Sequence, residues 1–335
     1  MSHTRGSLAQ KFVAEFKVHE YPYLSKLRPF RELFVNVWRL SRFLKTINPS
    51  LIHSFNYMSE YSEPLAAKLA FIPWVFTKKN MSWKGLAYNQ WKVRSKLASD
   101  IIIQNSDMLV SFYPKRKNVH LIPRGVNASY FNTVENPEFK FAENVLNDKS
   151  KRRIVTVANL IPVKGIEDLI QAFAILQKNH ANWQLWIVGD TNLDKDYSNN
   201  LKELSEIKGL RNDIIFFGKQ EDVRPFLRAS DIFVLPTRNI GRREGSPVAL
   251  LEAMASGLIV LGSEVAGIKD QLKDFQERLF QPSMPEDLAQ KMAPFLKNSI
   301  EQNKKLGEEM KQLSITRFSI QNEIQKHLDV YEKYV

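Results

Sequence analysis

The chain contains no cysteine, and this absence narrows the kinds of protein it can be. It excludes disulfides and thiolate metal sites, and it is typical of proteins that work in a reducing compartment. Long apolar runs are also missing, since none approaches the ~18 residues needed to span a bilayer. The first residues lack the apolar core of a signal peptide. We therefore expect a cytoplasmic protein.

The chain is long enough for more than one domain, and its positive charge is unevenly distributed. Its 335 residues suit two domains, and 25% of them are charged, as in soluble globular proteins. The net charge of +12 is concentrated at the start, because residues 1–125 hold 20 Lys plus Arg against 7 Asp plus Glu. This half is expected to face nucleic acid, an anionic membrane surface or a phosphorylated substrate. The alternative is that scattered lysines only keep the protein soluble.

Short β-rich segments alternate with helical periodicity in the second half of the chain. These segments read RIVTVANL, WQLWIVGD, DIIFFG, DIFVLPT and LIVLGS. Their alternation with helices is typical of a parallel α/β sheet. After the first segment, apolar residues recur three and four positions apart, which predicts a helix with one buried stripe. The stripe consists of Ile166, Leu169, Ile170, Phe173 and Leu176.

The first half repeats this rhythm and predicts a second sheet. Its strand candidates are EFKVHEY, SLIHSFN, WVFTKKN, DIIIQNS and NVHLIPRG. Polar residues without periodicity follow, so we expect a first domain over 1–125, a linker over 126–150 and a second domain over 151–315. In open parallel sheets, ligands bind outside the carboxyl ends of the strands. The sequence therefore predicts a binding cleft between two sheets.

The segment REGSPVALLEAMASG predicts a short helix with an anion site at its start. Ser246 suits the N-cap, Pro247 the first helical position, and Gly257 the left-handed stop. The expected helix covers residues 247–256. Its first-turn amides carry a partial positive charge, so they would attract an anion such as a diphosphate.

Two glutamates flank this helix start. Glu244 lies in the preceding loop, where its carboxylate can reach a group attached to the phosphate, and Gly245 lets the backbone come close. Glu252 lies within the helix and could accept two hydrogen bonds from a ribose diol. The alternative is that Glu244 complements the helix dipole and Glu252 is a solvated helix residue. The segment around Glu252 carries almost no other charge, which favours a binding role.

The whole segment resembles the donor site of the family 4 retaining glycosyltransferases, which have the GT-B fold. Three other segments are similar to family motifs and occur in the family's order. They are VHLIPRGVNASYF, VANLIPVKGIEDLIQAFAIL and RFSIQNEIQKHLDVYEKYV. The resemblance implies an α/β protein with two Rossmann-like domains facing across a cleft. It also implies that a C-terminal helix, residues 316–335, packs back on the first domain.

The resemblance further implies roles for individual residues. Glu252 would hold the ribose of a nucleoside diphosphate sugar, and Glu244 would hold the hydroxyls of the sugar. Lys164 would neutralise the departing diphosphate, while Gly165 allows its close approach and the segment Gly245–Val248 assists. No metal and no cofactor are expected, because a lysine and a helix N-terminus supply the positive charge.

The implied activity is retaining transfer of a sugar to a glycan or lipid-linked acceptor in surface polysaccharide or lipopolysaccharide biosynthesis. The basic first domain would face the acceptor and the anionic inner face of the membrane, giving peripheral association. Nucleic acid is not expected as a partner, because the basic half lacks a recognition module. The alternative function is a catalytically degenerate GT-B protein that binds nucleotide sugars without turnover.

Several positions depart from the family pattern. Asn159 stands where an arginine is common, so diphosphate binding is weaker or Arg242 and Arg243 substitute for it. A histidine common on the acceptor side is replaced by Lys79 and Asn80, which become acceptor-side candidates. These departures leave both the donor and the acceptor side open to test.

The start of the chain departs as well. We expect the first strand and its glycine loop to be shortened or missing, with Gly6 as a remnant, or the first sheet to be completed differently. His53 follows a strand, and either an acceptor-site role or a structural role suits it. Aromatic residues of the first half form a sugar platform, a membrane-facing edge or part of the core. They are Trp74, Trp83, Tyr88 and Trp91.

Overall fold

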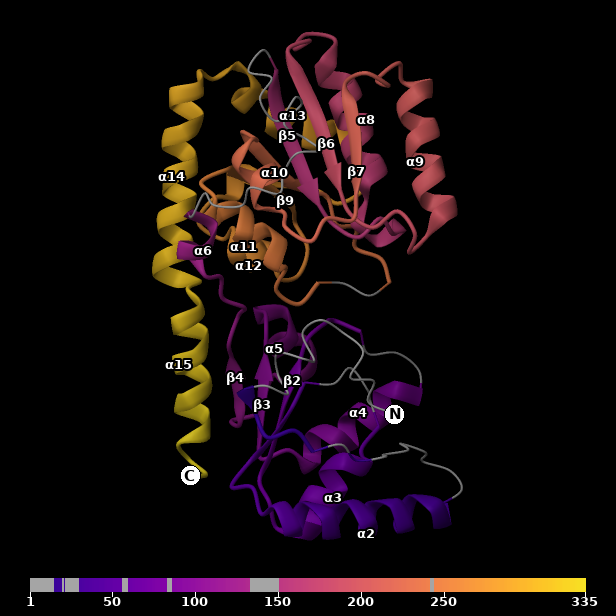
Figure 1. Cartoon of the computed structure of the whole chain (residues 1–335), viewed down its shortest axis with the longest axis vertical. Helices are drawn as coiled ribbons and strands as arrows, with labels where there is room; N and C mark the ends of the chain where they lie inside the picture. Colours follow the sequence, from indigo (N-terminus) through magenta and orange to yellow (C-terminus); the bar gives the residue numbers. More distant parts are fainter. Residues whose placement is uncertain are drawn as a thin grey trace. The chain divides into compact units, whose positions relative to one another are not determined.

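The computed structural model describes residues 15–19, 21, 30–55, 60–82, 86–132, 151–241 and 244–335. Along these residues helices alternate with strands, and the strands form a four-stranded and a six-stranded sheet (Figure 1). The α/β architecture expected from the sequence is confirmed. Some residues named above lie outside the described part. They are Gly6, Trp83, Arg242, Arg243 and, within the expected linker, residues 133–150.

The six-stranded sheet is parallel and comes from the second half of the chain. Its order is β10-β9-β8-β5-β6-β7. The strands are β5 (Arg152–Val157), β6 (Trp183–Val188), β7 (Ile214–Gly218), β8 (Ile232–Leu235), β9 (Ile259–Ser263) and β10 (Leu279–Phe280). The first five lie within the five predicted segments, except that β5 begins one residue earlier, at Arg152. The sixth has only two residues, too few for a periodic pattern.

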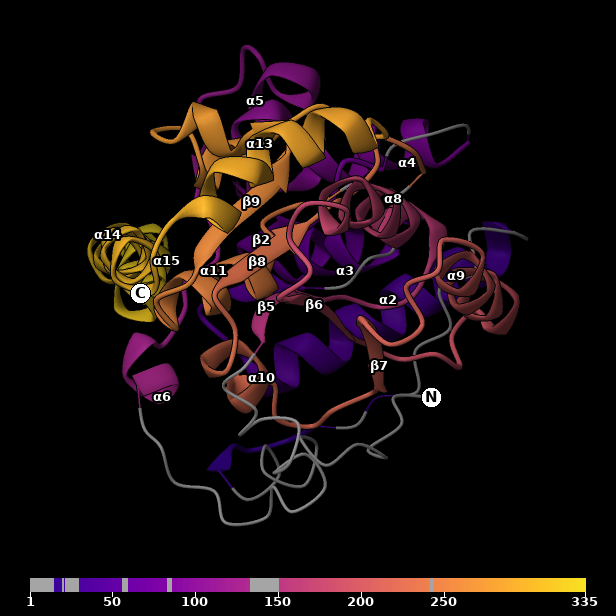
Figure 2. The same cartoon turned by 90° about the horizontal axis from the view of Figure 1, so that it is seen from above.

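Helices cover both faces of this sheet (Figure 2). Successive strand residues point to opposite sides, so Ile154 belongs to one apolar core and Val155 to the other. One face packs against α8 (Ile166–Gln177), α9 (Lys195–Ile207) and α13 (Pro285–Lys297). The other packs against α10 (Arg224–Arg228), α11 (Val248–Ala255), α12 (Ile268–Gln271) and α14 (Ile300–Arg317). All five residues of the predicted stripe on α8 are buried, which confirms that helix.

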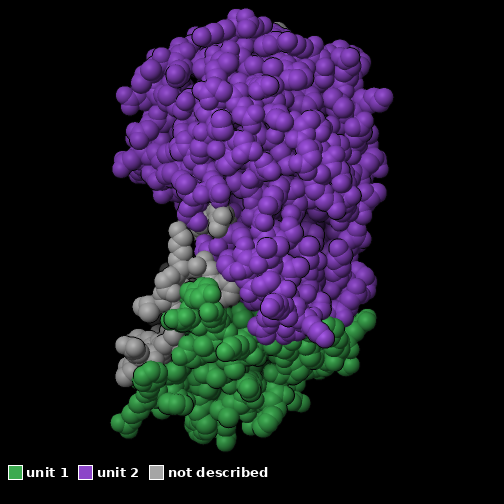
Figure 3. Space-filling view, turned by 180° about the vertical axis from the view of Figure 1, so that it is seen from behind, with its two compact units in different colours: residues 1–77, 83–101, 331–335 green, residues 78–82, 102–330 purple. Residues whose placement is uncertain are grey.

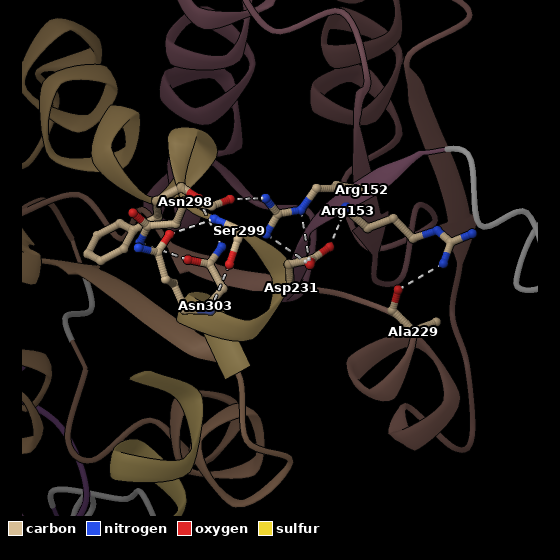
Figure 4. A network of polar contacts seen from close by, with 9 residues as sticks. Arg152, Arg153, Ala229, Asp231, Asn298, Ser299 and Asn303 are labelled. Atoms are coloured by element: carbon tan, nitrogen blue, oxygen red, sulfur yellow. Dashed lines mark hydrogen bonds and ion pairs between the residues drawn. The ribbon is translucent and has the colours of Figure 1, made fainter. Parts of the chain in front are cut away.

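A polar network ties the amino ends of β5 and β8 together (Figure 4). The Arg152 guanidinium donates to Asp231 Oδ1 at 3.2 Å and to the carbonyl of Asn298 at 2.6 Å. The backbone N–H of Arg153 donates to Asp231 Oδ2 at 2.9 Å, and its guanidinium donates to the carbonyl of Ala229 at 3.0 Å. These contacts stabilise the strand starts and leave the carboxyl ends of the same strands for other groups.

The four-stranded sheet has the order β1-β2-β3-β4. Its strands are β1 (Ile52–Ser54), β2 (Trp74–Lys78), β3 (Asp100–Ile103) and β4 (Val119–Leu121). The accompanying helices are α2 (Phe30–Ile47), α3 (Ser62–Ala70), α4 (Leu86–Leu97) and α5 (Ser106–Phe112). The next helix, α6 (Ala128–Asn132), packs instead against α11 and α14. Trp74 and Trp91 are buried, so these two aromatic residues belong to the core, while Tyr88 is 41% exposed.

The strand predicted over EFKVHEY is wrong for the part of it that the structure describes. Residues 15–19 and 21 contain no strand, and residue 20 is not described. Phe16 and Val18 are 59% and 45% exposed, so their alternation with polar residues does not mark a buried face. Alternation predicts a strand only where a neighbouring strand can pair with it.

The chain divides into two compact units (Figure 3). Unit 1 comprises residues 1–77, 83–101 and 331–335, and unit 2 comprises residues 78–82 and 102–330. Within unit 1 the C-terminal residues contact the first sheet. Tyr331, the last residue of α15 (Ile320–Tyr331), contacts His53, while Lys333 lies 3.4 Å from Asp100.

Candidate active site

The helix predicted after β8 exists as α11, with a different start. Pro247 is its N-cap, and no side chain caps it. The Ser246 hydroxyl instead accepts hydrogen bonds from the Arg124 backbone N–H at 3.2 Å and from the Gln271 side chain at 3.0 Å. The predicted capping role of Ser246 is therefore wrong. The helix ends as expected at Gly257, which has a φ of +78°.

Lys164 and Glu244 are 80 positions apart in the sequence and form an ion pair within unit 2. Lys164 ends η1 (Pro162–Lys164), a 3-10 turn after β5, and Glu244 lies after β8. The Lys164 Nζ contacts Glu244 Oε1, and the Thr237 hydroxyl lies 3.4 Å from the same oxygen. The structure thus brings the two predicted catalytic side chains together at the carboxyl ends of adjacent strands.

Backbone contacts hold the Glu244–Gly245 segment in place. The side chain of the buried Asn105 donates to the carbonyl of Gly245 at 2.8 Å and to that of Glu244 at 3.3 Å. A Cβ at Gly245 would lie 2.0 Å from the carbonyl oxygen of Lys79, so only glycine fits there. The glycine is therefore required by chain packing inside unit 2, and the ligand approach predicted for it stays a prediction.

Arg238 anchors the loop that carries Lys164. Its guanidinium donates to both carboxylate oxygens of Asp168, at 2.7 and 2.5 Å, and contacts Glu167. Its backbone N–H donates to the carbonyl of Val163 at 2.8 Å. Hydrogen bonding to Asp168 raises the pKa of Arg238 above its ordinary value. Arg238 therefore joins the segment after β8 to the turn that ends at Lys164.

Replacing Arg238 with methionine should lower the free energy of unfolding by about 3 kcal/mol, because the Asp168 carboxylate would be left buried without its cation. Thermal unfolding measures the loss. Arg211→Met is the matched control, since Arg211 is 80% exposed and pairs at 3.9 Å with an exposed glutamate. Equal melting temperatures of the Arg238 variant and the wild type would contradict the anchoring role.

Glu252 is half-buried on α11, and none of the described residues donates a hydrogen bond or a cation to its carboxylate. Burial alone raises the pKa of this carboxyl above its ordinary value of 4.5. A carboxylate that is desolvated and unpaired is destabilised relative to water. Its arrangement therefore suits a ligand that donates hydrogen bonds, such as a vicinal diol.

Glu252→Gln should make the protein more stable at neutral and alkaline pH in the absence of nucleotide. The pKa of Glu252 is raised in the folded state, so the charged carboxylate opposes folding above that pKa and has no such effect below 4.5. The gain should therefore vanish on acidification, as followed by melting curves across pH. Glu206→Gln, at an exposed position, is the control. A gain that persists at low pH would contradict the assigned cause.

Two other residues of the predicted site lie near Lys164 in the sequence, and they differ in solvent exposure. Asn159, in the loop after β5, is exposed, and its carbonyl accepts from the Ile161 N–H at 2.9 Å. Gly165 is buried with a φ of +61°, and a Cβ there would lie 2.2 Å from the Pro236 carbonyl. The sharp turn from η1 into α8 therefore requires glycine at this position.

The acceptor-side candidates belong to different units of the chain. His53 is in unit 1, where Nδ1 contacts the Tyr331 hydroxyl and Nε2 lies 2.8 Å from the Thr77 hydroxyl. Both ring nitrogens are engaged, which matches the structural alternative for His53. Lys79 and Asn80 are half-buried in unit 2, and Asn80 Oδ1 accepts from the Ser82 N–H.

A buried lysine precedes these candidates. Lys78 is 1% exposed, and burial lowers its pKa to about 7. Its Nζ donates to the carbonyl of Ser82 at 3.1 Å and lies 4.5 Å from the centre of the Phe112 ring. The lysine thereby secures the turn that carries Lys79 and Asn80.

Sequence reasoning missed Arg238 and Asn105, which hold the site in place. Arg238 follows β8 by three positions and Asn105 follows β3 by two. Polar residues directly after a buried parallel strand lie at the carboxyl edge of the sheet. Their position directly after a strand could have indicated that both residues lie near the site. It does not identify the partner of either side chain.

The two parallel α/β sheets, together with a lysine and a glutamate at adjacent strand ends, define a protein of the GT-B class. Residues 138–313 match the family model described as Glycosyl transferases group 1, and residues 2–130 match Glycosyltransferase Family 4. The chain belongs to the glycosyl transferases group 1 family.

Known proteins from several bacteria are similar to this chain. Amylovoran biosynthesis glycosyltransferase AmsK of Erwinia amylovora is 34% identical over 123 residues, which cover 36% of this chain and 30% of that protein. An N,N'-diacetylbacillosaminyl-diphospho-undecaprenol alpha-1,3-N-acetylgalactosaminyltransferase of Campylobacter jejuni is 26% identical over 302 residues, covering 84% of this chain and 76% of that protein. For AmsK and two other curated relatives, the match spans 30–56% of the relative's length.

Solved structures agree on the fold. The crystal structure of Anabaena Alr3699/HepE in complex with UDP superposes on this chain with a TM-score of 0.77 and 16% identity. The match covers 89% of this chain and 82% of that one. This likeness confirms the GT-B fold expected from the sequence, and at this identity it concerns the fold alone.

Proposed function

We propose that this protein is a retaining glycosyltransferase that moves a sugar from a nucleoside diphosphate sugar to a glycan or lipid-linked acceptor. Its role would be in surface polysaccharide or lipopolysaccharide biosynthesis. Relatives named for amylovoran biosynthesis and for transfer to a diphospho-undecaprenol acceptor support this assignment. HepE, which shares the fold, was crystallised with UDP and with UDP-glucose, which supports a nucleotide-sugar donor.

The observation that carries the proposal is the convergence of Lys164 and Glu244 beside α11. Breaking a glycosidic bond to a diphosphate places negative charge on the leaving group and positive charge on the sugar. Lys164 and the first-turn amides of α11 would stabilise the diphosphate. Glu244 would stabilise and orient the sugar, and Glu252 would hold the ribose.

We propose that neither a metal nor a cofactor takes part. The lysine and the helix N-terminus supply the charge that a divalent cation supplies in other transferases. The chain does contain an Asp-x-Asp pattern at Asp194 and Asp196, but Asp194 caps α9 by accepting from the Tyr197 N–H at 3.0 Å. Activity that survives a chelator such as EDTA would support the proposal, and loss restored by Mg²⁺ would oppose it.

The test of function is a screen of nucleoside diphosphate sugars for thermal stabilisation. A ligand bound only by the native state at 100 times its Kd stabilises by about 2.7 kcal/mol, which raises the melting temperature. Donors that stabilise the protein are then assayed for hydrolysis and for transfer to glycan acceptors. The anomeric configuration of the product, read by NMR, separates retention from inversion. Absence of stabilisation by every donor would oppose a nucleotide-sugar site.

A second candidate function is binding of nucleotide sugars without turnover. Asn159 favours it, since this position carries no charge where the family pattern has a cation. The two functions predict different results in the same assay. A binding protein is stabilised by the donor but neither hydrolyses it nor transfers its sugar, and Asn159→Arg would then be expected to tighten diphosphate binding.

We propose that the protein works in the cytoplasm and associates peripherally with the inner face of the membrane. No helix in the described part of the chain has the length and apolarity to cross a bilayer. The charge of residues 1–125, 20 basic against 7 acidic, supports attraction to anionic lipids.

A further inference from the structure

Helix α2 buries some of its apolar residues against unit 1 and leaves others exposed to solvent. Leu33, Val37 and Leu40 are 5–8% exposed and form a core cluster with Ala66 of α3. The two helices lie alongside each other within unit 1 (Figure 1). The spacing of these buried residues is the ordinary one for an amphipathic helix on a domain.

Beside its buried face, α2 exposes a row of aromatic side chains. Phe30, Phe34 and Trp38 follow each other at intervals of four residues and are 60%, 72% and 55% exposed. Residues spaced by four lie on successive turns of one helix face. Water-facing rings in a contiguous row mark a surface that contacts another apolar phase or partner. We call this row, together with its flanking cations, the α2 face.

Cations flank the aromatic row on the side away from the buried face. The exposed basic residues of α2 are Arg31, Arg39, Arg42 and Lys45, and Glu32 is the acidic residue of the helix. The Arg42 guanidinium lies 5.6 Å from the Trp38 ring centre. At the end of α3, Phe71 is 88% exposed, and Lys45 Nζ lies 5.6 Å from its ring centre.

We propose that the α2 face docks on an anionic lipid surface, with Phe30, Phe34, Trp38 and Phe71 entering the headgroup region and the arginines and Lys45 contacting lipid phosphates. This inference rests on the membrane association proposed above and names the surface that makes it. A helix that combines Trp and Phe with Lys and Arg lies in the plane of the interface, where rings bury and cations reach the phosphates.

The charges argue against the other occupants of such a face. A second copy of this chain would bring four cations of each helix against four of the other, with one carboxylate per helix to offset them. A zwitterionic or purely apolar partner leaves the cations without counterions. An anionic bilayer supplies both the phosphates and an apolar layer into which the rings can insert.

The test is co-sedimentation with vesicles of phosphatidylcholine alone or mixed with phosphatidylglycerol. Wild-type protein should bind the anionic vesicles, and high salt should weaken the binding by screening. Phe34→Ser/Trp38→Ser and Arg39→Glu/Arg42→Glu should each lower the partition coefficient by about tenfold or more. The matched control is Ile207→Ser/Arg211→Glu in unit 2, where both side chains are also exposed. Unchanged melting curves verify that each variant folds.

Insertion has a signature of its own. The chain contains six tryptophans, so quenching by brominated lipids is compared between wild type and Trp38→Phe. The conservative variant should keep its binding and lose the greater part of the quenching. Equal quenching in the two proteins would mean that Trp38 stays out of the bilayer, which overturns the proposed mode.

The outcomes separate this inference from the proposed function. If wild type binds anionic vesicles and both α2 variants bind equally well, the inference is overturned and peripheral association survives. If the wild type does not bind anionic vesicles, both the inference and the proposed peripheral association are wrong. Suppose the wild type does not bind vesicles but binds oligonucleotides or forms a dimer, and the α2 variants lose that binding. The inference would then be overturned in favour of the nucleic acid or the second copy. Donor stabilisation of the α2 variants reports independently on the nucleotide-sugar site.

Discussion

Glu244→Gln should lower the rate of sugar transfer by about a hundredfold to a thousandfold while leaving the melting temperature close to that of wild type. Asn105 bonds the backbone of residues 244 and 245, so the position of this segment at the strand ends does not depend on the charge of the Glu244 side chain. Glutamine has the same shape but cannot stabilise a cationic sugar. Single-turnover assays with the donor found by the stabilisation screen measure the effect.

The same variant should keep or increase its affinity for the nucleoside diphosphate product. In this structure Glu244 is the partner of Lys164, so a diphosphate must compete with it for the ammonium group. Removing the carboxylate charge removes that competition. Glu206→Gln, with a 58% exposed side chain on α9, controls for the loss of one negative charge. Transfer at the wild-type rate, or a large loss of diphosphate affinity, would contradict the role given to Glu244.

Lys164→Met should affect both binding and chemistry. The ammonium is the nearest described cation to Glu244 and would carry the charge of the leaving diphosphate, so we expect transfer to fall by about a thousandfold. Diphosphate affinity should fall by about tenfold or more, because a charge-assisted contact is lost. Isothermal titration with the nucleoside diphosphate measures the second effect separately from turnover.

Lys164→Arg is the control that separates charge from position. Arginine retains the cation, so diphosphate affinity should stay near that of wild type, while its planar, longer side chain places the charge differently and lowers the transfer rate. If methionine and arginine at this position bind and turn over alike, the lysine does not contact the leaving group. If neither change has any effect, the role proposed for Lys164 is wrong.

The fold could be predicted where local pattern and tertiary environment agree. The buried parallel strands β5 and β6 are rich in β-branched and aromatic residues, and α8 carries its stripe at helical spacing. Gly257 has the left-handed φ that stops α11. The pattern failed at Phe16 and Val18, where alternation exists without a partner strand. Local sequence states which conformation suits a segment, whereas pairing depends on residues far along the chain.

The sequence named individual candidate residues for the site, but it did not predict the contacts among them. The family resemblance singled out Lys164 and Glu244, yet nothing within either segment indicates that the two side chains pair across 80 positions. Ser246 was a good N-cap by residue type, and the competing bonds from Arg124 and Gln271 took its hydroxyl instead. Arg238 had no local signal for its partner Asp168, because that contact exists only once β8 lies beside β5.

Unit 1 combines residues from both ends of the chain, and this affects how it folds during its synthesis on the ribosome. Tyr331–Val335 belong to it, and Lys333 and Tyr334 contact the buried Asp100. A ribosome makes these residues more than 200 positions after Asp100, at about 5–20 residues per second. Unit 1 emerges first from the ribosome, yet it waits on the order of ten seconds or more for its last contacts. During that time unit 2 can fold before unit 1 is complete.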